Sequence, residues 1–177
     1  GSTLSVPVPV EGLPWGRLLT RAVAPNAFTP ADAEALTMIA AVLGAAIERD
    51  LVDRAQEAVA GCGRFALQHD VADTAQHVVA VLHHLLQTRW AALARAHPER
   101  TTLQIAEAAG AIRAGEEWSP QAPSGPTASA PVMRDGQLWG RLLVGDLGHR
   151  RFTPREEKVV DALARILTSA VDRSDQP

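Results

Sequence analysis

The 177-residue sequence is poor in cysteine, in aromatic residues and in long apolar runs. Cys62 is its one cysteine, tyrosine is absent, and aromatic residues make up 4% of the chain. One cysteine cannot build an internal disulfide framework and suits a reducing compartment, so we expect a cytoplasmic location. No signal peptide is visible, and the longest apolar run, residues 35–47, falls short of the roughly 20 residues that a membrane span needs.

The sequence also lacks the short motifs of the common enzyme and cofactor classes. It has no P-loop, no dinucleotide-binding glycine pattern, no Cys-x-x-Cys pair and no HExxH. We therefore expect no enzymatic activity, no catalytic residue, no cofactor and no metal site. Asp73, His77 and His84 share one helix face and could in principle ligate zinc. A solvated polar face is the commoner explanation, because a structural zinc site takes four ligands.

Charge of either sign is not in large excess. The net charge is −3 and the isoelectric point is near 6.1. Neither value gives an electrostatic reason to expect a nucleic acid or an anionic membrane as a partner, so we expect contact with neither. The hydrophobic fraction of 46% is ample for a buried core in one or two domains.

The dominant positive feature is an internal repeat with a constant offset of 124 residues. The sequence WGRLL at 15–19 recurs at 139–143, and FTP at 28–30 recurs at 152–154. With the same offset the repeat runs without a gap over residues 1–49 and 125–173. Repeats of this kind mark one supersecondary unit that is used twice.

Each copy predicts a β-hairpin followed by a helix. Glu11-Gly12 in the first copy and Asp135-Gly136 in the second are turn pairs that favour a tight hairpin. Thr29 and Thr153 stand where an N-cap hydroxyl is preferred, and a proline follows each at the first helical position. Two strands and a helix cannot close a core alone. We therefore expect that sequence precedes Gly1, that the first hairpin extends the sheet of the second copy, or that it pairs across a symmetric dimer.

The hairpin, WGRLL, FTP and a long apolar helix together resemble the C-terminal half of a GAF domain, the small-molecule sensor module of signalling proteins. The middle of the chain is similar to the N-terminal half of that family: "LQHDVADTAQHVVAVLHHLLQTRWAALARA" to its first helix and strand, and "TTLQIAEAAG" to its second strand. The resemblance implies an α/β (α+β) fold, a GAF-like antiparallel sheet flanked by long helices, with the hairpin–helix repeat inside it. Residues 1–54 would be half of a GAF-like domain with a connecting helix, and residues 55–177 a shortened complete one.

The sequence departs from the GAF pattern where the family builds the roof of its ligand pocket. Only a polar, proline-bearing loop separates Gly110 from Gly125. That loop is too short for a helix and a strand. The methionine-sulfoxide reductase branch of the family needs several cysteines, the cyclic-nucleotide signature is missing, and bilin-binding members carry a cysteine within the domain proper, whereas Cys62 lies before it. We read Cys62 as a small buried residue at a helix junction.

The helices carry more apolar surface than a sheet can cover. Each has two apolar stripes side by side, where a helix packed on a sheet alone needs one. A helix buried on all sides within one domain would explain this pattern, but a helix from another subunit or from the sister repeat is the more economical explanation. We therefore predict a homodimer with these interface residues: Leu36, Leu43, Ile47, Val159, Leu163, Ile166 and Ala170.

The first helix is predicted to continue past Arg49 as a connector toward Ala60, where Gly61, Cys62 and Gly63 should interrupt it. Connectors of this type join tandem signalling modules, as the GAF resemblance implies. The sequence thus favours a sensory or regulatory module of a cytoplasmic signalling protein, which dimerises and passes a signal through its helices to an output domain outside this chain.

A receptor for a small molecule, such as a nucleotide or metabolite, is the alternative, and a stand-alone enzyme is a third and weaker one. In the receptor reading, the residues that would converge on the ligand in an apolar pocket over the sheet are Trp90, Arg113, Trp118 and Arg141.

Overall fold

Residues 1–96, 102–119, 127–145 and 150–174 are described by a computed structural model of the chain. The chain divides into two compact units, residues 1–53 (unit 1) and residues 54–177 (unit 2). The boundary predicted from the sequence falls one residue later, after Arg54. No helix among the described residues is long and apolar enough to cross a membrane.

Unit 1 is a β-hairpin with the first part of a long helix. Strands β1 (Ser2–Val10) and β2 (Leu13–Ala22) form an antiparallel two-stranded sheet of their own. Glu11 and Gly12 join them with φ values of 50° and 77°, as a type I′ turn requires. The predicted tight hairpin is confirmed, and among the described residues its two strands make a sheet separate from that of unit 2.

Helix α1 (Pro30–Ala66) begins at the predicted Thr-Pro pair. Thr29 N donates to Asp32 Oδ2 over 2.7 Å, and Asp32 N donates to Thr29 Oγ1 over 3.3 Å, so the two residues satisfy each other's free backbone groups. The prediction that Gly61, Cys62 and Gly63 interrupt the helix is wrong. A glycine inside a helix costs only about 1 kcal/mol, and burial of the Cys62 side chain, 1% exposed, offsets that cost.

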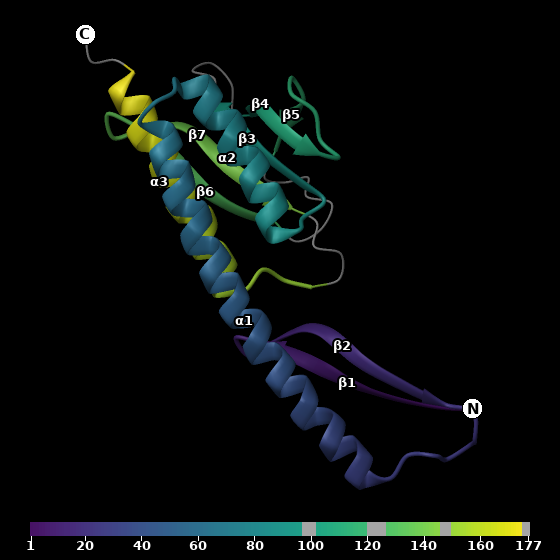
Figure 1. The fold of residues 1–177 in the computed structure, drawn as a ribbon. Coiled ribbons are helices and arrows are strands. Elements are labelled where there is room, and N and C mark those ends of the chain that lie inside the picture. Colours follow the sequence, from purple (N-terminus) through teal and green to yellow (C-terminus); the bar gives the residue numbers. More distant parts are fainter. Residues whose placement is uncertain (97–101, 120–126, 146–149, 175–177) are drawn as a thin grey trace. The chain divides into compact units, whose positions relative to one another are not determined.

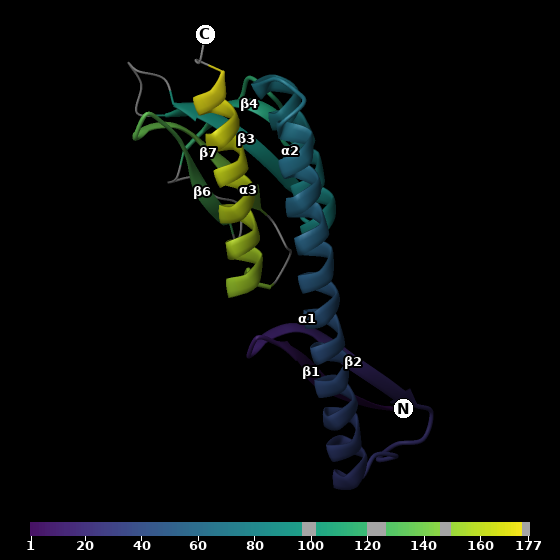
Figure 2. The same ribbon diagram turned by 60° about the vertical axis from the view of Figure 1, so that its left-hand side comes forward.

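Unit 2 is a five-stranded antiparallel sheet with helices on one face (Figures 1 and 2). The strands stand in the order β5-β4-β3-β7-β6, which confirms the expected antiparallel sheet flanked by helices. The predicted turn at 97–100 lies outside the described residues. Along the chain the elements of unit 2 after α1 are α2 (Val71–Leu86), β3 (Trp90–Ala96), β4 (Leu103–Gly110), β5 (Glu117–Trp118), β6 (Thr127–Arg134), β7 (Gln137–Gly145) and α3 (Pro154–Arg173).

The sequence repeat is also a repeat of structure. Asp135 and Gly136 turn the β6–β7 hairpin with φ values of 47° and 77°, close to those of the first copy. The register shifts after Val8 in β1 and after Val132 in β6, which are equivalent positions. Arginine to serine contacts repeat as well: Arg17 donates to Ser5 Oγ and Arg141 to Ser129 Oγ. Each hairpin–helix copy is therefore the same local structure.

The interface prediction is wrong for three residues of α3. Val159, Leu163 and Ala170 are 7%, 0% and 4% exposed, buried inside unit 2. Helix α3 contacts both β6 and α2, so its second apolar stripe is covered by a helix of the same unit. Ile166 is half-buried.

The predicted interface residues of unit 1 lie in a different environment. Leu36 and Ile47 pack against the small core of Val6, Val8 and Ala40, on the hairpin side of α1. Leu43 is 41% exposed, and its role in an interface stays a prediction.

A buried ion pair anchors the start of α3. The Glu156 carboxylate, in a residue 2% exposed, accepts two hydrogen bonds from Arg150, over 2.6 and 2.8 Å, and one from Thr153 N over 2.8 Å. Glu156 N in turn donates to Thr153 Oγ1, which completes a capping box. In unit 1, Asn26 and Asp32 occupy the equivalent positions, so the ion pair belongs to unit 2 alone.

Glu156→Ala should therefore destabilise unit 2 by about 3 kcal/mol, because it removes the carboxylate that accepts two hydrogen bonds from Arg150 and removes the capping box. Urea unfolding followed by circular dichroism measures this loss. Glu157→Ala is the matched control, since Glu157 lies in the same helical turn and is exposed. Equal losses for the two variants would contradict the structural role assigned to Glu156.

Candidate functional site

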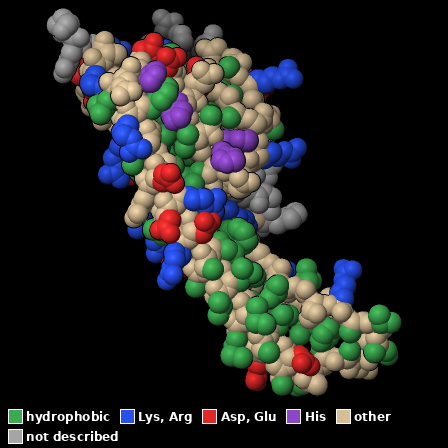
Figure 3. Space-filling view, viewed as in Figure 1, with side chains coloured by type: hydrophobic (Ala, Val, Ile, Leu, Met, Phe, Trp, Pro, Cys, Tyr) green, Lys and Arg blue, Asp and Glu red, His purple; other side chains and the backbone are tan. Residues whose placement is uncertain are grey.

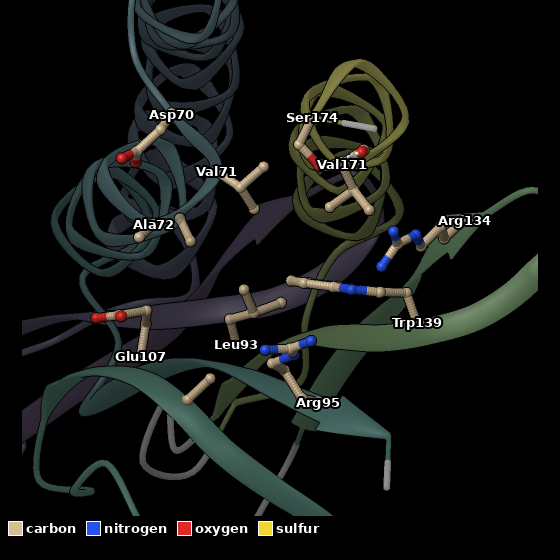
Figure 4. A pocket seen from close by; sticks show the side chains of 12 residues that line it. Asp70, Val71, Ala72, Leu93, Arg95, Glu107, Arg134, Trp139, Val171 and Ser174 are labelled. Atoms are coloured by element: carbon tan, nitrogen blue, oxygen red, sulfur yellow. Dashed lines mark hydrogen bonds between the residues drawn. The ribbon is translucent and has the colours of Figure 1, made fainter. Parts of the chain in front are cut away.

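A cleft of about 430 Å³ opens in unit 2 where the sheet meets the first turn of α2 and the last turn of α3. We call it the Trp139 cleft. Its wall combines apolar side chains with four charged ones, as Figure 4 shows. The lining residues are Asp70, Val71, Ala72, Ala75, Leu93, Arg95, Ala106, Glu107, Arg134, Trp139, Val171 and Ser174.

A β-bulge in β7 turns the Trp139 side chain into this cleft. In the β6–β7 pairing, Val132 faces Gly140 and Met133 faces Leu138, so Trp139 has no partner in the register. Such an extra residue bends the strand and re-aims its side chain. The Arg95 guanidinium lies 4.5 Å from the centroid of the Trp139 ring, within cation–π range. The indole and the guanidinium therefore form one stacked pair on the cleft wall.

The charges of the cleft are separated by sign. In Figure 4, Asp70 and Glu107 lie on the left, Trp139 and Arg134 lie on the right, and the Arg95 guanidinium lies in the middle, below Leu93. Asp70 is the N-cap of α2, and its Oδ1 accepts from Asp73 N over 2.8 Å, which fixes the carboxylate in place. The cleft thus offers a negative end, a middle with Leu93 and the Arg95 guanidinium, and a positive end with an aromatic face.

This arrangement is suited to binding. Arginine side chains bind carboxylate or phosphate groups, and carboxylates bind ammonium groups. A small zwitterion with an apolar body matches the order of charges along the cleft.

The predicted ligand residues are elsewhere. Trp90 and Trp118 are half-buried and pack against one cluster, Ala92, Ala94, Ile105 and Leu143. None of the predicted ligand residues lines the Trp139 cleft. The two tryptophans therefore belong to the hydrophobic core, at opposite ends of the β3–β4 pair, because Trp90 pairs with Gly110 and Trp118 pairs with Leu103.

The two predicted arginines do not join them in a cleft. Arg141 stands opposite Ala94 in the β3–β7 pairing, and its Nη1 donates to Ser129 Oγ over 3.2 Å across the hairpin. Arg113 is exposed in the segment between β4 and β5. The signal that was available for the cleft was Trp139 itself, which the sequence analysis used as a marker of the repeat.

The histidine face of α2 has a structural partner. His77 stacks on Phe65 with ring centroids 4.2 Å apart, and His69 stacks on Phe65 at 3.7 Å. These contacts join the end of α1 to α2 inside unit 2. Over the residues with a described placement, no group of three or more His, Cys, Asp or Glu side chains is arranged to hold a metal ion.

Solved structures of GAF domains resemble this chain in fold. The GAF domain of an Acinetobacter phosphoenolpyruvate-protein phosphotransferase is 11% identical, with 70% of this chain and 93% of that chain covered and a TM-score of 0.55. A phycoerythrobilin-bound GAF domain from a cyanobacterial phytochrome is 13% identical, with 68% and 96% covered and a TM-score of 0.58.

A third similar structure carries an enzyme name, the free methionine-R-sulfoxide reductase of Neisseria meningitidis in complex with its substrate. It is 14% identical, with 69% of this chain and 92% of that chain covered and a TM-score of 0.58. No protein-family model and no curated protein matches the sequence. The chain has the GAF fold, and the resemblance read from its sequence is confirmed at the level of fold.

The Cys62 thiol should be unreactive in the native protein. Burial raises its pKa to about 11, so at pH 8 the thiolate that reacts with disulfide reagents is a minute fraction of the total. Ellman's reagent should label Cys62 slowly in buffer and at once in 6 M guanidinium chloride, and the native rate should rise steeply toward pH 10. Rapid native labelling at pH 7 would contradict the assignment of Cys62 as a buried structural residue.

Proposed function

We propose that this chain is a sensory or regulatory module of a cytoplasmic signalling protein. It acts as a homodimer and passes a change of state along α1 toward an output domain outside this chain. The GAF fold supports the general kind of function, because the solved neighbours include GAF domains of a phosphotransferase and of a phytochrome.

The observation that carries the proposal is the continuity of α1. Its 37 residues begin in unit 1 and end in unit 2, without a proline after Pro30. A helix without a break transmits a rotation or a shift from one end to the other better than a flexible linker does. Its two ends are held by different cores: Leu36 and Ile47 pack on the hairpin, and Phe65 stacks on His77 of α2.

Signalling requires that an input binds two states of the module with different affinity. The contact between α1 and α2 is a place where such states can differ, because α2 also carries Asp70 at the rim of the Trp139 cleft. A ligand in that cleft would contact α2, α3 and the sheet together. Its binding would bias their packing, and α1 would carry the bias to unit 1.

A small-molecule receptor is the second candidate function, and the Trp139 cleft favours it. The separated charges of the cleft select a zwitterion with a carboxylate at Arg95 and Arg134 and an ammonium group near Asp70 and Glu107. This proposal replaces the four ligand residues expected from the sequence. It is compatible with the first function, since a receptor can be the input of the module.

Coupling along α1 can be measured by hydrogen exchange in the isolated chain. Val160→Ala opens a cavity at a side chain that is 1% exposed and should weaken unit 2 by about 2 kcal/mol. If α1 couples the units, the amides of residues 36–50 in unit 1 should exchange several-fold faster in this variant.

Asp53→Pro supplies the uncoupled control for this experiment, because a proline inside a helix breaks it. Asp53 is exposed, so Asp53→Ala tests the loss of the side chain alone. Val160→Ala should affect residues 36–50 in the Asp53→Ala background and leave them unaffected in the Asp53→Pro background. Unchanged exchange at residues 36–50 in the Val160→Ala single variant would refute transfer through α1.

The receptor function predicts that zwitterions whose ammonium and carboxylate groups are separated by an apolar chain, such as ω-amino acids, raise the melting temperature of unit 2. At a concentration 100-fold above the dissociation constant the gain is about 2.7 kcal/mol. N-acetylated and amidated forms, each lacking one charge, should give smaller shifts. Arg95→Gln should abolish the shift, since it removes both the cation and its stack on Trp139. Absence of a shift with every amino acid, or equal shifts in Arg95→Gln, would refute this receptor function.

A further inference from the structure

Unit 1 exposes apolar side chains at positions that unit 2 buries completely. In Figure 3, hydrophobic side chains gather over the part of the molecule that carries the hairpin and the start of α1. Two equivalent pairs on the helix side, each separated by the repeat offset, define the difference. They are Ile39, 57% exposed, with Leu163, 0%; and Leu43, 41%, with Leu167, 0%. Leu19 lies on the opposite face of the hairpin, because its neighbour Leu18 packs against the core beneath α1.

Unit 2 shows what covers this surface in the second copy. The outer edge of β7 pairs antiparallel with β3, and α3 lies against α2. The two helices are antiparallel, because Asp70 and Val71 at the start of α2 line the same cleft as Val171 and Ser174 at the end of α3. The cover thus consists of one antiparallel strand and one antiparallel helix.

Unit 1 has neither cover among its described residues. Its sheet consists of β1 and β2 alone, so the outer edge of β2 has no strand beside it. An exposed sheet edge next to exposed Ile39, Val42 and Leu43 is a template for pairing with another chain.

Gly16 on β2 indicates that another strand packs beside β2. At the equivalent position, Gly140, any side chain is sterically excluded, because a Cβ there would lie 2.6 Å from the Ala94 carbonyl oxygen of β3. Gly16 has no such steric restriction within unit 1, because a Cβ there would meet nothing within 4 Å, and its φ is not positive. A strand beside β2, in the place that β3 occupies beside β7, would give Gly16 the same close contact.

We propose that a second copy of this chain covers this surface, through β2 paired antiparallel with the β2 of its partner. A two-fold axis perpendicular to the sheet places the partner's β2 antiparallel to β2 and the partner's α1 antiparallel to α1. This single two-fold rotation therefore places both a strand and a helix beside unit 1, each antiparallel to its neighbour as in unit 2. The inference rests on the dimerisation in the proposed function and names its interface.

The spacing of the elements fits this arrangement. Neighbouring strands lie about 4.8 Å apart, so two helices that each cross a two-stranded hairpin of a four-stranded sheet lie about 10 Å apart. That is the ordinary distance between packed helices. Two half-domains would then make one closed layer of helices on a four-stranded sheet, with Ile39, Val42 and Leu43 between the helices.

The test is the mass of the full chain in solution, measured by light scattering over a dilution series. The unchanged chain should be a dimer. Gly16→Ala should raise the dissociation constant by at least about tenfold, because the new Cβ collides with the partner's strand. Gly61→Ala is the matched control, since a Cβ at Gly61 also meets nothing within 4 Å and Gly61 belongs to unit 2, whereas the proposed interface is formed by unit 1.

A second pair of variants tests the helix side of the interface. Val42 is 72% exposed, so Val42→Arg should leave the monomer folded and still dissociate the dimer. Ala41→Arg should leave the dimer intact, because the equivalent position in α3 is Arg165, whose side chain is 76% exposed. Circular dichroism verifies that all four variants keep their helix content.

The outcomes separate this proposal from the function on which it rests. A wild-type chain that is monomeric at every concentration overturns both the interface and the dimerisation. A dimer that survives Gly16→Ala and Val42→Arg overturns the interface alone and leaves another mode of dimerisation in place. Dissociation by both variants, with intact dimers in both controls, supports pairing through β2 and α1.

Discussion

The need to cover two open sides of a hairpin–helix unit governs this structure. A helix laid across two strands buries one apolar stripe, but the sheet edge and the flank of the helix remain open. In unit 2 both sides are closed by β3 and α2, and the result is a core in which Leu142, Leu163 and Leu167 are fully buried. In unit 1 the same local structure stands with both sides uncovered by any described residue. The two copies differ in what surrounds them far more than in how they fold.

The same bulge that is common to both copies has different consequences in the two surroundings. In unit 2 it turns Trp139 toward the sheet end, where Arg95 of β3 stacks on the indole and Asp70 of α2 stands at the rim. Trp15 occupies the equivalent place in unit 1 and is 39% exposed. A binding cleft thus needs the β3 and α2 half of the domain, and the repeated hairpin alone supplies only one of its walls.

Local signals in the sequence were sufficient for the elements. The turn pairs at 11–12 and 135–136 and the Thr-Pro helix starts each predicted the element that forms, because turns and caps depend on neighbours within a few residues. The Gly61–Gly63 segment was misread for the converse reason. The penalty for glycine in a helix is local and small, and packing around Cys62 and Ala66 outweighs it.

The sequence by itself determined the repeat, the hairpins and the helix starts, since these follow from residue spacing, and its resemblance to GAF domains implied the antiparallel α/β fold. Only the tertiary structure decided which apolar stripe meets which partner: Val159 and Leu163 are core, whereas Ile39 and Leu43 are exposed, although the two helices read alike. It also decided that Arg95, Glu107 and Trp139 meet in one cleft while Trp90 and Trp118 join the core. The periodicity of apolar residues in a sequence shows only that one face of a helix is apolar. The identity of the covering surface depends on chain segments far away in sequence, and no local pattern encodes it.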